Sequence, residues 1–63
     1  MSTFLERIKE EQQELSSKLI KLRNFIGTPS FDLLDSPNKR LLRDQVLAMS
    51  KYNSILNDRI MIN

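Results

Sequence analysis

Apolar residues recur along the first half of the chain at intervals of three and four. The members of this series are Leu5, Ile8, Leu15, Leu19, Leu22 and Ile26, with Gln12 at the one polar position. This heptad spacing is typical of a helix that packs one seam against a partner helix. Thr3 and Glu6 have the spacing of a capping box. Gly27 and Pro29 indicate a left-handed helix end, so the pattern predicts a helix over about residues 3–26.

A second helical pattern begins at Ser36 and Pro37, where serine suits the N-cap and proline the first helical position. Its seam positions are Leu42, Gln45, Met49, Tyr52, Leu56 and Arg59, and beside them runs a stripe of Leu41, Ala48, Ile55 and Ile62. Val46 and Leu47 widen the apolar surface further. The pattern predicts a helix over about residues 37–60, with more apolar surface than one partner helix covers.

The connection over residues 27–36 is unusually apolar. Phe31, Leu33 and Leu34 do not suit a solvated loop, so we expect a short helical turn folded over the end of a hairpin. The sequence therefore predicts an all-α fold: one antiparallel helical hairpin domain over residues 1–63.

The short chain predicts self-association. A chain of 63 residues buries only about 60% of its unfolded surface, and small domains compensate with disulfides, metals or oligomerisation. There is no cysteine and no histidine, which leaves oligomerisation into a homo-oligomeric helical bundle. The residues expected at the oligomer interface are Gln12, Leu15, Leu19, Leu22, Gln45, Met49 and Leu56.

Composition argues against several classes of function. Without His or Cys no nucleophile–base pair is evident, so we expect no enzyme, no metal site and no cofactor. No apolar run approaches the ~20 residues of a membrane span, and the first residues do not resemble a signal peptide. We therefore expect a cytoplasmic protein. The net charge of +2, with acids and bases mixed, argues against nucleic acid and against a membrane surface as partners.

Charge is distributed unevenly between the two ends of the predicted hairpin. The bend end holds six bases (Lys18, Lys21, Arg23, Lys39, Arg40, Arg43) and three acids (Asp32, Asp35, Asp44), a balance of +3. The open end holds four bases (Arg7, Lys9, Lys51, Arg59) and five acids (Glu6, Glu10, Glu11, Glu14, Asp58), a balance of −1. Bases beside a helix N-terminus can bind anions. Alternatively, they form a solvated surface or pair with the acidic end of a neighbouring hairpin.

Polar residues on the predicted seams have two interpretations. Gln12 and Gln45 either set register and oligomer state or mark a polar site. Tyr52 and Arg59 either line a polar cavity between protomers or lie at the open end, where Arg59 pairs with an acid.

The chain resembles a family of short helical proteins from crAss-like and other tailed phages. The shared residues are Phe4-Leu5-Glu6-Arg7, Lys18-Leu19, Leu22, Phe25-Ile26, Phe31, Leu34, Leu41-Leu42, Gln45, Ala48-Met49, Tyr52, Leu56 and Arg59-Ile60. The second helix is more distantly similar to the hairpin of phage sponge proteins. Those homo-oligomers sequester the cyclic nucleotide signals of the CBASS and Thoeris defences. The resemblance implies a phage-encoded homo-oligomer that traps such a signal, cyclic oligonucleotide or cyclic ADP-ribose type, and blocks host defence.

The residues that we expect to bind this ligand combine bases with one aromatic ring. They are Lys18, Lys21, Lys39, Arg40, Arg43, Tyr52 and Arg59. Arginine and lysine bind phosphates, and an aromatic ring stacks on a base. The alternative is a helical interaction module that inhibits or adapts a host or phage protein through its exposed apolar stripe.

Overall fold

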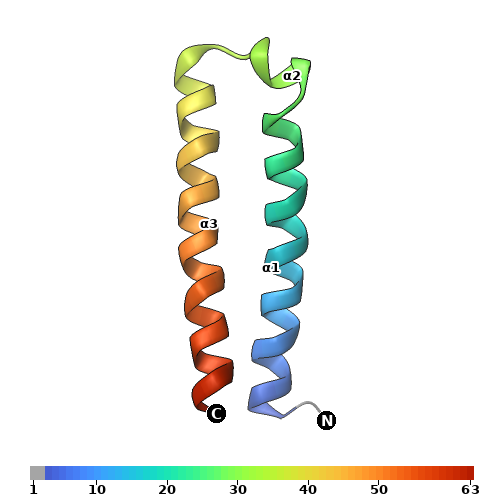
Figure 1. The fold of residues 1–63 in the computed structure, drawn as a ribbon, viewed down its shortest axis with the longest axis vertical. Helices are drawn as coiled ribbons and strands as arrows, with labels where there is room; N and C mark the ends of the chain where they lie inside the picture. Colours follow the sequence, from blue (N-terminus) through green and yellow to red (C-terminus); the bar gives the residue numbers. More distant parts are fainter. Residues whose placement is uncertain (1–2) are drawn as a thin grey trace.

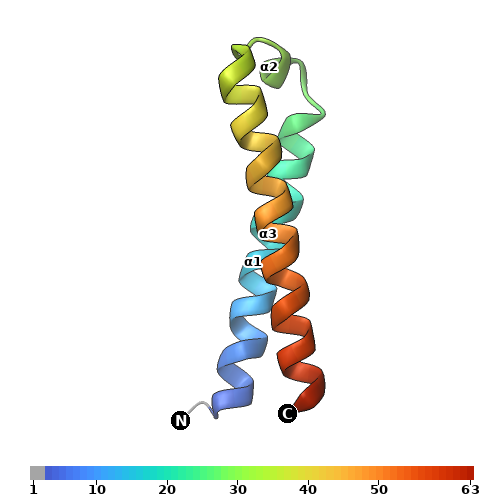
Figure 2. The same ribbon diagram turned by 90° about the vertical axis from the view of Figure 1, so that its left-hand side faces the viewer.

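The computed structural model describes residues 3–63 and consists of three helices over that range. These are α1 (Phe4–Ile26), α2 (Pro29–Asp32) and α3 (Ser36–Ile62). The long helices α1 and α3 lie side by side and run in opposite directions, and α2 lies at the end where they are joined (Figure 1). They cross at a shallow angle (Figure 2). The predicted all-helical class with two long helices is confirmed; residues 1–2 of the predicted domain lie outside the described residues.

The two ends of α1 show one confirmed and one wrong prediction. The capping box is present: the Glu6 amide donates to Thr3 Oγ1 at 3.1 Å, and the Thr3 amide donates to Glu6 Oε2 at 3.2 Å. The predicted left-handed cap at Gly27 is wrong, because its φ is −82°. The Gly27 and Thr28 amides instead donate to carbonyls three residues earlier, at 3.2 and 3.0 Å. A tight turn of this kind satisfies the last carbonyls without a left-handed residue.

The start of α3 lies one residue before its predicted position. Asp35, and not Ser36, is the N-cap: its Oδ1 accepts a hydrogen bond of 2.9 Å from the Asn38 amide. Ser36 and Pro37 occupy the first two helical positions, where a missing proline N–H costs nothing. The helix continues through Ile62, two residues beyond the predicted end.

The bend is organised around Phe31, whose side chain is 1% exposed. The ring of Phe25 meets it edge-on with centroids 6.2 Å apart, and Lys39 Nζ and the Arg43 guanidinium lie 5.9 and 5.3 Å from its centroid. The predicted helical turn is confirmed as α2. Phe31 gives this turn an apolar anchor between the two long helices.

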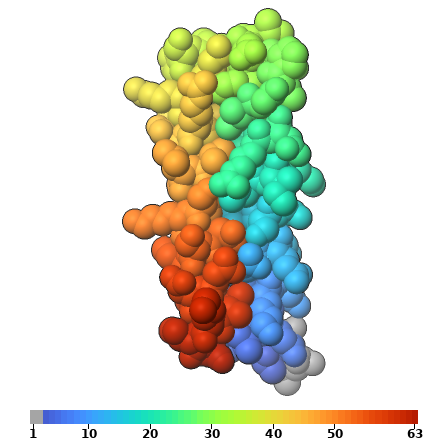
Figure 3. All heavy atoms as spheres, in the orientation of Figure 1, coloured from blue at the N-terminus to red at the C-terminus, as the bar shows by residue number. Residues whose placement is uncertain are grey.

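The seam between α1 and α3 differs from the predicted one on α3. Ile8, Leu19 and Leu56 are buried, and the half-buried or buried α3 residues with heptad spacing are Leu42, Val46, Met49, Asn53, Leu56 and Ile60. The predicted seam positions Gln45 and Tyr52 are exposed. Both series alternate intervals of three and four and share half of their members, so spacing alone did not separate them. On the face that the space-filling view shows, the atoms of the two long helices meet without an open gap (Figure 3).

Candidate arginine groove

The seam divides the surface of the hairpin into two faces. We call the first the groove face; on it Arg23 Nη2 donates to Ser50 Oγ across the helices at 2.9 Å. We call the second the stripe face; on it the Tyr52 hydroxyl donates to Glu11 Oε1, and the Arg59 guanidinium lies 5.6 Å from the Phe4 ring centroid. The two faces carry different chemistry.

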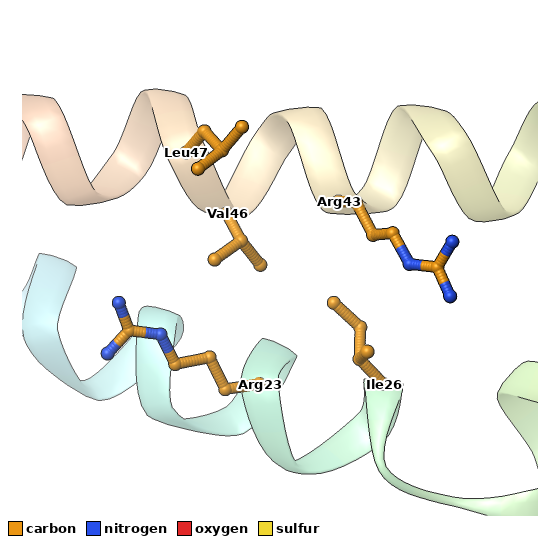
Figure 4. Close-up of a pocket in the computed structure, with 5 residues that line it drawn as sticks. All are labelled: Arg23, Ile26, Arg43, Val46 and Leu47. Carbon is orange, nitrogen blue, oxygen red and sulfur yellow. The ribbon is translucent and has the colours of Figure 1, made fainter.

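The groove face holds a pocket of about 320 Å³ near the bend. Its lining residues are Arg23 and Ile26 of α1 and Arg43, Val46 and Leu47 of α3. Figure 4 shows Val46 and Ile26 reaching toward one another from facing helices, with the two arginine head groups at opposite ends and pointing apart. The pocket therefore has an apolar floor and a cationic group at each end. We call it the arginine groove.

Each arginine of the groove has a contact that orients it. Ser50 accepts the hydrogen bond of Arg23, and Phe31 underlies the guanidinium of Arg43. Guanidinium groups bind phosphate with paired hydrogen bonds and stack on flat rings. An apolar floor between two such groups suits a flat base with anionic groups on either side.

The fold distributes the predicted ligand-binding residues over several places. Arg43 lines the arginine groove, and Lys39 is turned toward Phe31. Arg40 lines a separate hollow of about 230 Å³ with Ser36 and Pro37 at the start of α3.

The other predicted ligand residues lie away from the groove. Tyr52 and Arg59 contact α1 side chains on the stripe face, and Lys18 and Lys21 are exposed on α1. Lys18 follows Glu11 by seven residues, which places both on that same face.

Sequence reasoning missed Arg23, Val46 and Leu47 as members of one site. Arg23 directly follows the seam residue Leu22, and Val46 precedes Leu47 at the seam edge of α3. Aligning the two helices as an antiparallel pair from the bend outward would have placed Arg23 near Val46. Because the seam of α3 was predicted at other residues, this proximity was not recognised.

The Sequestin family model matches residues 2–62. The chain belongs to the Sequestin family. The family's name suggests a sequestering function. No curated protein and no solved structure matches the chain. Over residues 3–63, no helix has an apolar stretch long enough to cross a bilayer, and no acidic cluster is arranged to hold a metal ion.

This Sequestin family member also has a polar layer inside its seam. Gln12 Nε2 donates to Ser16 Oγ at 2.9 Å and to Asn53 Oδ1 at 3.1 Å, and Ser16 Oγ lies 3.2 Å from Asn53 Oδ1. All three side chains are half-buried. A polar layer is satisfied in only one alignment of the helices, so it fixes their register.

Most of the predicted interface residues lie within the hairpin. Leu19 and Leu56 are buried between α1 and α3, and the half-buried members are Gln12, Leu15, Leu22 and Met49. Gln45 is exposed on α3.

Proposed function

We propose that this chain is a phage-encoded homo-oligomeric protein that sequesters a small nucleotide signal and so blocks host anti-phage defence. The signal is of the cyclic oligonucleotide or cyclic ADP-ribose type. The observation that carries the proposal is the arginine groove: an apolar floor with a guanidinium at each end, in a member of the Sequestin family. Sequestration requires no chemistry at the ligand, only affinity and sufficient protein.

The arginine groove supports a nucleotide through two kinds of contact. Its floor of Ile26, Val46 and Leu47 removes the faces of a base from water. Its ends, Arg23 and Arg43, offer forked donors to phosphate oxygens. A volume of about 320 Å³ lies at the lower end of ligand pockets, so the phosphates lie at the rim, beside the guanidinium groups.

Calorimetry tests the proposal with the full chain and a panel of cyclic dinucleotides, cyclic trinucleotides and cyclic ADP-ribose isomers. Arg23→Ala should weaken binding by about 1.5–3 kcal/mol, roughly tenfold or more, because a charge-assisted contact is lost. Arg43→Lys keeps the charge above Phe31 but removes the fork, so it should weaken binding as well.

Lys51→Ala is the matched control, since Lys51 is exposed on α3 and outside the groove. It should leave the affinity nearly unchanged. If the wild-type protein binds no member of the panel at about 100 μM, an interaction weaker than ~5.5 kcal/mol, the nucleotide proposal is wrong.

The second candidate function is a helical interaction module that acts on a host or phage protein. The exposed apolar stripe on α3, which includes Leu41, Ile55 and Ile62, favours it. Thermal melting separates the two candidates. A nucleotide at 100 times its dissociation constant stabilises the fold by about 2.7 kcal/mol, whereas an interaction module shows no shift with nucleotides.

A further inference from the structure

The stripe face presents an apolar row along the whole length of α3. Leu41, Ala48, Ile55 and Ile62 follow one another at intervals of seven residues, so they lie on one side of the helix. Leu41 is 56% exposed, Ile55 47% and Ile62 83%. With Gln45, Tyr52 and Arg59 between them, these residues form a second heptad seam, in which Tyr52 and Arg59 contact α1 and the apolar members are exposed. We call this seam the α3 stripe.

The hairpin by itself has a very small core. In the part of the chain that the structure describes, the buried hydrophobic side chains are Ile8, Leu19, Phe31 and Leu56. Two helices form a single layer, and a layer with apolar residues on a further side is stabilised by a second layer. Because the uncovered stripe belongs to every copy of the fold, it suits a partner that is present wherever the protein is made. A second copy of the chain is such a partner.

The α3 stripe is complementary to itself when two copies run in opposite directions. Its apolar members are symmetric about a point between Lys51 and Tyr52, so Leu41 pairs with the partner's Ile62. At the next pair, Ala48 meets the partner's Ile55, a small side chain against a large one. A two-fold axis then passes close to Tyr52.

Charge favours the same direction. The bend end, with Lys18 on the stripe face, carries a balance of +3 over the whole end, and the open end, with Glu11 on the stripe face, carries −1. An antiparallel copy places the basic end of one hairpin beside the acidic end of the other. A parallel copy brings the two basic ends together.

We propose that the α3 stripe docks on the α3 stripe of a second copy, antiparallel, around a two-fold axis near Tyr52. This inference rests on the homo-oligomer in the proposed function and specifies its interface. The arginine groove lies on the opposite face of each hairpin, so each protomer keeps one groove open to solvent. The dimer therefore binds one ligand per protomer, and the two sites act independently.

The first test compares one aspartate substitution on each face, with molecular mass measured by light scattering and no ligand present. Ile55→Asp should convert a dimer, at twice the chain mass of 7.4 kDa, into a monomer. Leu47→Asp should leave the dimer intact, although Leu47 is the more exposed side chain at 69%. A wild-type monomer, or a dimer that only Leu47→Asp dissociates, overturns the proposal.

Cysteine cross-linking tests the direction without destabilising the helices, because the chain has no cysteine of its own. With a short bis-maleimide, Tyr52→Cys should cross-link to itself, since only a residue near the axis meets its own copy. Leu41→Cys and Ile62→Cys should cross-link when mixed and not when tested alone. Self-cross-linking of Leu41→Cys, or none at Tyr52→Cys, overturns the antiparallel arrangement.

Calorimetry distinguishes a failure of the proposed ligand from a failure of the proposed dimer arrangement. Ile55→Asp monomers should still bind the nucleotide that the wild-type protein binds, with the same stoichiometry per chain. A dimer without nucleotide affinity refutes only the proposed ligand. Nucleotide affinity that disappears on dissociation refutes the outward-facing groove.

Discussion

The two faces of the hairpin both expose apolar side chains but arrange them differently. On the groove face, Leu47 and Val46 lie between two arginines near the bend, and a serine follows at position 50. On the stripe face, residues such as Leu41 and Ile55 recur along the length of α3. A concentrated apolar site bordered by cations suits a small ligand, whereas an extended row suits a helix. The arrangement of apolar surface, more than its amount, distinguishes a pocket from an interface.

The largest effect should come from the seam that separates the faces. Leu56 is fully buried, so Leu56→Ala should lower the free energy of unfolding by about 2–5 kcal/mol. Leu47→Ala, on the exposed groove face, should change it by less than about 0.5 kcal/mol. Urea unfolding followed by circular dichroism measures both. Equal losses would show that the faces contribute to stability as much as the seam.

A smaller effect should come from the polar layer. Asn53→Leu leaves the half-buried Gln12 amide without its partner across the seam, which should cost about 1–3 kcal/mol. The double variant with Gln12→Leu should recover most of that loss, because an apolar pair needs no hydrogen bond. If the double variant is as unstable as Asn53→Leu, the polar layer does more than fix the register of the helices, and this prediction is wrong.

A substitution on the groove face should lower nucleotide affinity with little effect on the free energy of unfolding. Ser50→Ala removes the acceptor that orients Arg23, so nucleotide affinity should fall by about 0.5–1 kcal/mol, roughly two- to fivefold. The free energy of unfolding should change by less than about 0.5 kcal/mol. Ser54→Ala, at an exposed position one turn further along α3, is the control and should affect neither. Unchanged affinity in both variants would remove Ser50 from the site.

The smallest effect should come from the stripe face. Tyr52→Phe removes the hydroxyl that donates to Glu11 but keeps the ring in the α3 stripe. Because this contact is exposed, the free energy of unfolding should change by less than about 0.5 kcal/mol and the dimer should persist. Light scattering and thermal melting measure the two quantities. Dissociation by this variant would make the hydroxyl, and not the ring, the essential group.

Local signals in the sequence predicted the helices well. The capping box at Thr3 and the apolar bend around Phe31 depend on neighbouring residues, and both are present. The residues of α3 that form the seam were harder to predict, because two heptad series share Leu42 and Leu56 and differ at positions such as Val46. Choosing between them requires knowing which side chains α1 presents opposite each position. The residues of the arginine groove come together only in that same alignment, so the sequence alone did not predict the groove.

The anchor at Phe31 has a consequence for the order in which the chain folds. Its contacts with Phe25, Lys39 and Arg43 join residues close in sequence, whereas the contact of Phe4 with Arg59 closes nearly the whole chain. Closing the longer loop costs about 1.3–2 kcal/mol more in chain entropy. We therefore expect folding to begin at the bend and the helices to pair from there toward the open end. The arginine groove lies beside the bend, so it should form before the open end of the seam is closed.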